Sequence, residues 1–251
     1  MKSDLSLALA LADAADTITM KFFKSQSLAV RTKADATPVS EADEAVERMI
    51  RERLAADRPD DGIVGEEEGT TGSTARRWIL DPIDGTKNYV RGIPVFATLI
   101  ALEVDGAGEV AVVSAPALGR RWWASRGEGA FLNGEPIHVS AVNECREAHF
   151  AYDSITDFEK AGLTANFISL VHRVGRTRAF GDFWSHMLVA EGSMEIAIEP
   201  EVAHWDMAAV KVIVEEAGGQ FTTLAGEATA AGGSGVSTNG LLHECVLEMF
   251  R

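Results

Sequence analysis

The residues best suited to chemistry lie in one short segment, Trp78-Ile79-Leu80-Asp81-Pro82-Ile83-Asp84-Gly85-Thr86. The apolar run over residues 78–80 predicts a buried strand that ends at Asp81, because a turn containing proline follows it. Asp84 can point to the same side as Asp81, and Gly85 and Thr86 open a predicted helix whose free N–H groups suit a phosphate. Hard oxygen ligands beside such a helix start indicate a magnesium-assisted phosphoryl site. Alternatively, Asp84 only caps the helix.

Further acids follow a predicted strand or open a predicted helix elsewhere in the chain, and they are Asp43, Glu66 to Glu68, and Asp206. Each has an ordinary structural explanation. Asp43 and Ser40 have the spacing of a capping box, and three adjacent acids in a loop are usually a solvated surface. If all these groups met at one place, their repulsion would be costly without cations. Together they therefore predict a cation site.

The composition is that of a globular protein, with 46% hydrophobic and 24% charged residues among 251. A net charge of −15 argues against nucleic acid or an anionic membrane surface as the main partner, but not against a phosphorylated substrate that metal ions neutralise. Cys145 and Cys245 suggest neither a disulfide framework nor a zinc site, so a reducing cytoplasm fits best. The apolar run over residues 5–12 is followed by acids and predicts a core helix rather than a signal segment.

The pattern of elements divides the chain into two halves that form one compact unit. Residues 1–140 predict an α+β half, in which helices precede strands joined by short turns, and Asn133-Gly134 is a strong hairpin signal. Residues 141–251 alternate strands and helices, which predicts an α/β half. We expect the acidic site where the halves meet.

The acidic segments resemble, in order, the motifs of the inositol monophosphatase-like family of magnesium-dependent, lithium-sensitive phosphatases. The family's Gly-Glu-Glu, Asp-Pro-Ile-Asp-Gly-Thr and Trp-Asp are matched by Gly65-Glu66-Glu67, by Asp81 through Thr86, and by Trp205-Asp206. The resemblance covers residues 33–219, and it aligns Lys33 with a basic residue near the family's site. It implies a layered αβαβα sandwich of the inositol monophosphatase/fructose-1,6-bisphosphatase type, two to three Mg²⁺ ions and a homodimer.

The resemblance also implies a role for each acid. One magnesium would be held by Glu66, Asp81 and the carbonyl of Ile83, and a second by Asp81, Asp84 and Asp206. Glu67 would support the site or a third ion. Thr86, hydrogen-bonded to Asp43, would orient the attacking water, and the N–H groups of Gly85 and Thr86 would bind the phosphate.

The expected substrate follows from the segment Arg178-Ala179-Phe180-Gly181-Asp182-Phe183-Trp184, where the family commonly has small residues. Asp182 adds a carboxylate there, and Glu199 matches the family acid that contacts the substrate beyond its phosphate. Two acids favour a substrate with a cation. The resemblance to the histidinol-phosphatase branch therefore predicts L-histidinol phosphate, with Arg178, Asp182 and Glu199 as substrate residues.

Three alternatives remain open. The chain could hydrolyse inositol-1-phosphate or another small phosphomonoester, because the catalytic motif is shared among these enzymes. It could be a non-enzymatic interaction protein that keeps the fold, although such a protein would not need the Asp43 and Thr86 pair. Asp182 could simply cap the helix that follows it.

Overall fold

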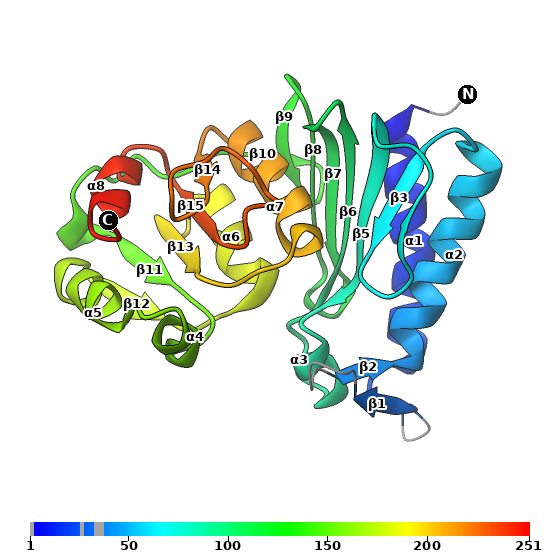
Figure 1. Ribbon diagram of the computed structural model, residues 1–251, viewed down its shortest axis with the longest axis horizontal. Coiled ribbons are helices and arrows are strands. Elements are labelled where there is room, and N and C mark those ends of the chain that lie inside the picture. The colour runs from blue at the N-terminus through cyan, green and yellow to red at the C-terminus, as the bar shows by residue number, and fades with distance from the viewer. Residues whose placement is uncertain (1–2, 26–27, 33–37) are drawn as a thin grey trace.

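The computed structural model describes residues 3–25, 28–32 and 38–251, and it stacks the chain in alternating layers of helices and sheets (Figure 1). Helices α1 (Asp4–Phe22) and α2 (Glu41–Asp57) cover the outer face of the first sheet. Helices α6 (Asp182–Ala190) and α7 (His204–Glu216) lie between the two sheets. The outer face of the second sheet is covered by α4 (Ile155–Lys160), α5 (Thr164–Arg173) and α8 (His243–Glu248). This order of layers confirms the predicted αβαβα sandwich.

The first sheet has eight strands in the order β10-β9-β8-β7-β6-β5-β3-β4. The strands are β3 (Gly62–Gly65), β4 (Gly69–Thr71), β5 (Arg76–Asp84), β6 (Ala97–Val104), β7 (Ala107–Ala115), β8 (Arg120–Ser125), β9 (Gly129–Leu132) and β10 (Glu135–Ile137). Neighbours are antiparallel except for β3 and β5. The Asn133-Gly134 hairpin is confirmed, since both residues have positive φ and join β9 to β10.

The second sheet has five strands in the order β12-β11-β13-β15-β14. They are β11 (His149–Ala151), β12 (Arg176–Arg178), β13 (Ile196–Glu199), β14 (Gln220–Thr222) and β15 (Gly235–Thr238). A short pair, β1 (Val30–Thr32) and β2 (Pro38–Ser40), lies apart from both sheets, near α3 (Thr86–Val90). The sheets fall on either side of residue 140, but α6 and α7 pack on the first sheet, so the division into halves stays a prediction.

The side chains of strand β5 pack against two layers of helices, one on each face of the sheet. Trp78 and Leu80 pack in the cluster formed with α1 and α2, while Ile79 belongs to the cluster formed with α6 and α7. Successive side chains of a strand point to opposite faces. Asp81 therefore follows Ile79 onto the α7 side, which is the side where a site between the halves must lie.

One local prediction is wrong. Strand β5 does not end at Asp81 but continues to Asp84, because its register against β6 shifts between these residues. Pro82 sits in that irregularity, where no ladder N–H is needed, and its carbonyl accepts the hydroxyl of Thr98 at 2.8 Å. Beyond the three adjacent acids, residues 69–71 form β4, which pairs antiparallel with β3.

The two cysteines lie side by side although they are 100 residues apart in the chain. The Sγ atoms of Cys145 and Cys245 are 3.3 Å apart, and both residues are free thiols. Their separation in sequence gave no sign of this contact. Among the described helices, none is both long and apolar enough to cross a membrane.

The packing of α7 generates a stability prediction. Ile213 is fully buried in the cluster between α7 and the first sheet. We expect Ile213→Ala to lower the free energy of unfolding by about 2–5 kcal/mol, from lost apolar contact and a residual cavity. Urea denaturation would measure this change. Ile168→Ala on α5 is the matched control, because Ile168 is 39% exposed and should cost little; equal losses would contradict this account of the core.

Candidate active site

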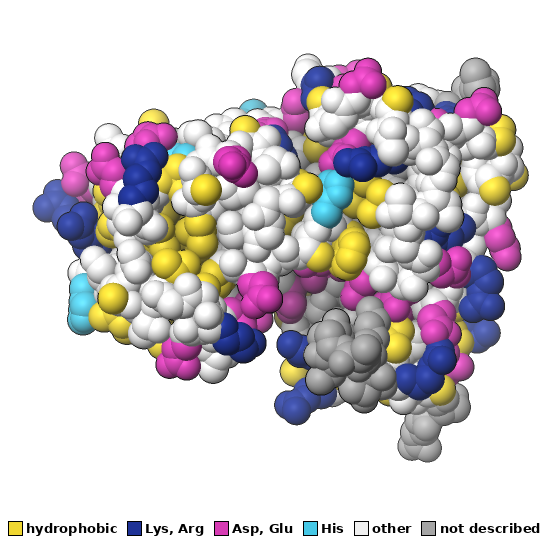
Figure 2. Space-filling model, viewed as in Figure 1, with side chains coloured by type: hydrophobic (Ala, Val, Ile, Leu, Met, Phe, Trp, Pro, Cys, Tyr) yellow, Lys and Arg dark blue, Asp and Glu magenta, His cyan; other side chains and the backbone are white. Residues whose placement is uncertain are grey.

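A pocket of about 450 Å³ opens where β5, α6, α7 and β13 converge. Figure 2 shows acidic side chains gathered around the hollow between the two halves of the molecule. The predicted residues that line this pocket are Glu66, Asp81, Ile83, Asp84, Gly85, Thr86, Asp182, Glu199 and Asp206. Side chains from distant parts of the chain therefore meet in one cavity, as the motifs predict.

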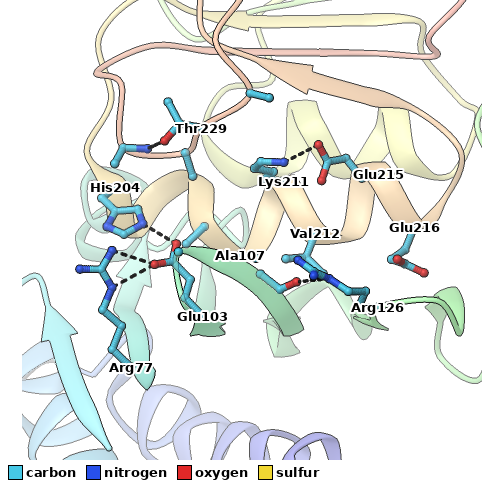
Figure 3. Close-up of a pocket in the computed structure, with 16 residues that line it drawn as sticks. Arg77, Glu103, Ala107, Arg126, His204, Lys211, Val212, Glu215, Glu216 and Thr229 are labelled. Atoms are coloured by element: carbon cyan, nitrogen blue, oxygen red, sulfur yellow. Dashed lines mark hydrogen bonds and ion pairs between the residues drawn. The ribbon is translucent and has the colours of Figure 1, made fainter. Parts of the chain in front are cut away.

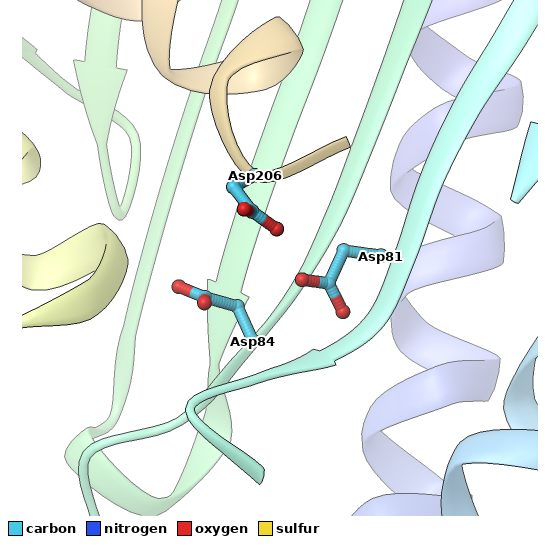
Figure 4. Close-up of side chains that lie close together, drawn as sticks. All are labelled: Asp81, Asp84 and Asp206. Carbon is cyan, nitrogen blue, oxygen red and sulfur yellow. The ribbon is translucent and has the colours of Figure 1, made fainter. Parts of the chain in front are cut away.

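Asp81, Asp84 and Asp206 form the centre of this pocket (Figure 4). Each offers a carboxylate oxygen, and these oxygens all lie within 4.8 Å of one another. Two of the three side chains are held by the N-terminal ends of helices. Asp84 accepts the N–H of Phe183 at 2.7 Å, at the start of α6, and Asp206 accepts the N–H of Ala203 at 2.7 Å, at the start of α7.

The electrostatics of this cluster fit a bound cation. Asp81 is 2% exposed, and its Oδ1 atom is buried without a hydrogen-bond partner. Burial raises the pKa of Asp81 well above its usual value, and repulsion from Glu66, Asp84 and Asp206 raises it further. Burial and neighbouring carboxylates raise the pKa of Asp84 in the same way. An all-oxygen donor set with an unsatisfied buried oxygen suits a hard divalent cation.

Asp43 is fully buried and uses its two oxygens for different contacts. Oδ2 accepts the N–H of Ser40 at 2.8 Å and its hydroxyl at 2.5 Å, which completes the predicted capping box. Oδ1 lies 3.3 Å from the hydroxyl of Thr86, which also lies 2.9 Å from the carbonyl of Ile83. Burial raises the pKa of Asp43 to about 6, although the Ser40 hydrogen bonds oppose the shift. The cap and the contact with Thr86 therefore coexist.

Gly85, not Asp84, is the N-cap of α3, so the alternative explanation of Asp84 as a helix cap is wrong. Gly85 has a φ of +79°, and a Cβ atom there would lie 2.9 Å from the carbonyl oxygen of Val95. Both the left-handed backbone and the close approach require glycine. The turn consequently brings the first N–H groups of α3 to the pocket wall.

Asp182 and Glu199 form a second acidic group in the same pocket. Asp182 begins α6 with a φ of +49°, and it does not cap the helix, because Gly181 is the N-cap and no side-chain cap bond forms. Its Oδ2 accepts the amide N–H of Asn88 at 2.9 Å. Burial raises the pKa of Asp182 to about 8, and repulsion by Glu199 adds to the shift. The Oε1 atom of Glu199 is buried without a hydrogen-bond partner and lies 3.5 Å from Nε2 of His186.

Besides Asp43, which contacts Thr86, two of the predicted residues that the structure describes do not line this cavity. Arg178 on β12 lines a different, mainly apolar pocket of about 250 Å³ together with Phe180 and Trp184. Glu67 follows Glu66 but does not line the acidic pocket. Lys33 lies outside the described residues.

Sequence reasoning missed Glu47, which holds the Glu66 turn in place. Its fully buried carboxylate accepts the N–H groups of Glu67 at 2.8 Å and Glu68 at 3.0 Å. A Cβ atom on Gly65 would lie 2.1 Å from Oε1 of Glu47, so this close approach requires glycine at residue 65. The signal was present, since Glu47 lies one helical turn after Asp43 on the same inward face of α2. Asp153 and Lys87 also line the pocket and were not predicted.

The raised pKa values generate a prediction for the metal-free protein. Protonation of Asp43 and Asp182 is favoured in the folded state up to about pH 6 and about pH 8, against an ordinary value of 3.8. The stability that these groups contribute is present below about pH 4 and is lost as the pH rises through those values. We therefore expect the free energy of unfolding without metal to fall between pH 4 and 8, and added Mg²⁺ to restore it at pH 8. Urea denaturation across this range would measure both effects.

Asp81→Asn should stabilise the metal-free protein at pH 8 by about 0.5–2 kcal/mol, because it removes one buried charge from the cluster. It should also remove the stabilisation by Mg²⁺. Asp60→Asn is the control, since Asp60 is exposed and outside the pocket. A destabilised Asp81→Asn variant that still gains stability from Mg²⁺ would contradict this account.

Comparisons with known proteins agree with this geometry. The profile of the inositol monophosphatase family matches residues 1–251. A histidinol-phosphatase of Mycobacterium tuberculosis is 54% identical over 250 residues, covering 97% of this chain and 96% of the relative. A histidinol-phosphatase of Streptomyces coelicolor is 52% identical over 253 residues, covering 97% and 95%.

Solved structures show the same arrangement of layers. The IMPase of Thermotoga maritima has a TM-score of 0.88 at 32% identity, covering 98% of this chain and 96% of that one. The extragenic suppressor protein SuhB of Bartonella henselae has a TM-score of 0.91 at 29% identity, covering 98% and 97%. With its motifs, its layers and its full length in agreement, this chain belongs to the inositol monophosphatase family.

Proposed function

We propose that this protein hydrolyses L-histidinol phosphate to L-histidinol and inorganic phosphate with the aid of Mg²⁺. The observation that carries the proposal is that one pocket contains two separate clusters of acidic side chains. Asp81, Asp84 and Asp206 suit the metal-dependent chemistry of the family, and Asp182 and Glu199 suit a substrate whose other end is cationic. The high identity to histidinol-phosphatases supports the same substrate.

The metal ligands in this proposal are those that the motifs assign. Two to three Mg²⁺ ions would be held by Glu66, Asp81, the carbonyl of Ile83, Asp84 and Asp206, with Glu67 in a supporting role. Bound Mg²⁺ would supply charge neutralisation on the phosphoryl group and a lowered pKa for the attacking water. The Oδ1 atom of Asp81 is buried without a hydrogen-bond partner, and this observation most directly favours a bound cation.

The protein's own groups would orient the reactants. Thr86 lies between Asp43 and the pocket, and its single hydroxyl proton can go to Asp43 or to the carbonyl of Ile83. In either case an oxygen lone pair of Thr86 remains free to accept a hydrogen bond from the attacking water. The N–H groups of Gly85 and Thr86 would bind the phosphate oxygens.

The far end of the substrate would be recognised by charge. Histidinol carries an ammonium group and an imidazole, both of which can donate hydrogen bonds to carboxylates. Burial raises the pKa of Asp182, and repulsion by Glu199 and Asp153 raises it further, so a cation placed there would relieve that repulsion. The proposal assigns Arg178 no contact with a substrate bound in the same chain, because Arg178 lines the other pocket.

The decisive experiment compares kcat/KM for phosphate release from L-histidinol phosphate and from inositol-1-phosphate with Mg²⁺ present. We expect the wild-type protein to prefer L-histidinol phosphate, and Asp182→Asn to lower its kcat/KM by about 10- to 100-fold, the value of one charge-assisted hydrogen bond. Asparagine tolerates the left-handed backbone of Asp182 and can still accept from Asn88, so the fold should persist.

Two further variants separate the parts of the proposal. Asp81→Asn should abolish release from both substrates, while Asp60→Asn should change neither. A wild-type preference for inositol-1-phosphate would overturn the substrate but keep the metal site. Full activity in Asp81→Asn would overturn the metal site itself.

We also propose a homodimer that pairs through the apolar pocket beside α6. This pocket is lined by Phe180, Trp184 and Leu188, and the indole N–H of Trp184 is buried without a partner. Light scattering should give twice the chain mass of 26.9 kDa for the wild-type protein. Phe180→Glu should give a monomer and Ile168→Glu on α5 should not; a wild-type monomer would refute the dimer.

The cytoplasmic location stays a proposal supported by the free cysteines.

A further inference from the structure

A second pocket, of about 360 Å³, lies between α7 and one end of the neighbouring strands β5, β6 and β7 of the first sheet. Its lining includes a network of three side chains that come from separate elements (Figure 3). Arg77 comes from β5, Glu103 from β6 and His204 from the first turn of α7. None of these residues belongs to the family motifs described above.

Glu103 is the centre of the network. Its Oε2 accepts from Nε of Arg77 at 3.0 Å and from a second guanidinium nitrogen at 2.9 Å. Its Oε1 lies 2.7 Å from Nε2 of His204, and since an ionised carboxylate cannot donate, this nitrogen carries the proton. The Glu103 side chain is 10% exposed. Burial alone would raise the pKa of Glu103, but the contacts with His204 and Arg77 outweigh it and lower the pKa.

The network joins the two backbone segments that carry the acids of the metal cluster. Arg77 is four residues before Asp81 and lies on the same face of β5, directly opposite Glu103 in the ladder. His204 is two residues before Asp206, at the very start of α7. The hydrogen bonds that Glu103 accepts therefore attach the first turn of α7 to the strand that holds Asp81.

Apolar packing alone would not fix this attachment. The apolar contacts of α7 begin at Trp205 and Met207 and continue along the helix to Ile213 and Val214, but such contacts are not directional. A carboxylate that accepts from two sides restrains both distance and rotation at the first turn. A change of a few tenths of an ångström there would alter the spacing between Asp81 and Asp206.

We propose that Glu103 is a positioning residue for the metal cluster: by holding His204 against Arg77 it sets the spacing of Asp206 from Asp81 and thereby the affinity for a divalent cation. The inference rests on the proposed metal site. It differs from a purely structural role, in which Glu103 would stabilise the fold without affecting cation binding.

The test measures Mn²⁺ binding directly, by the loss of the free-ion EPR signal as protein is added, with no substrate present. Glu103→Gln should weaken binding by about tenfold, the lower end of the effect of residues that orient metal ligands. Glu109→Gln is the matched control, because Glu109 on β7 pairs with Arg126, the residue after β8, at 3.2 Å and is not hydrogen-bonded to Glu103 or His204. It makes the same chemical change away from the network and should leave binding unchanged.

A second pair of variants keeps the test independent of folding. His204→Ala should weaken Mn²⁺ binding to a similar extent, while His204→Gln, which can place an N–H near the position of Nε2, should restore most of it. The double variant Glu103→Gln/His204→Ala should bind Mn²⁺ no more weakly than either single variant, because both substitutions remove the same contact.

The outcomes separate the two proposals. If the wild-type protein does not bind Mn²⁺, the proposed metal site fails, and this inference fails with it. If the wild-type protein binds but Glu103→Gln and His204→Ala bind equally well, the metal site stands and the positioning role is refuted, even if both variants melt at lower temperature. Loss of binding in Glu109→Gln to the same degree would also refute it, because the effect would then reflect overall charge.

Discussion

The rest of the structure depends on the repulsion among three carboxylates, one buried and two half-buried, that lie close together where β5, α6 and α7 meet. Burial and mutual repulsion raise the pKa values of Asp81 and Asp84, so the metal-free cluster costs folding free energy. A protein can keep such an arrangement only if other interactions over-determine the positions of these groups. The layers on either side of the cluster supply those interactions.

Backbone and side-chain contacts share this task. The helix starts of α6 and α7 each give one N–H to an acid, at Phe183 and at Ala203. Glu47 holds the turn after β3 by two N–H groups, and Glu103 ties α7 to β5. Glu47 and Glu103 act from positions outside the pocket. Inside it, the Oδ1 atom of Asp81 has no hydrogen-bond partner and is available for a cation.

Much of this site could be predicted from sequence because its acids stand beside strong local signals. Asp81 follows a short apolar run, and the capping box around Asp43 is a local pattern. The parts that were missed depend on contacts between distant segments. Strand β5 continues through Pro82 only because its register against β6 shifts there. Nothing near Glu103 in the sequence indicates that it will contact His204, which lies 101 residues later.

The charge pattern of the pocket also bears on substrate choice. Bound metal would attract the phosphate at one end, whereas Asp182 and Glu199 would repel any second anionic group at the other. Lys87 offsets only part of this repulsion, since the pKa of Asp182 stays raised despite it. A sugar bisphosphate would therefore meet a penalty that a monoester with a cationic tail avoids. A neutral polyol would be neither repelled nor attracted by these two carboxylates, and it would leave them without a cationic partner. Discrimination in this pocket would thus come from the two acids outside the metal cluster. Of these, Asp182 is also the residue where the sequence departs from the small neutral segment that the family resemblance predicts.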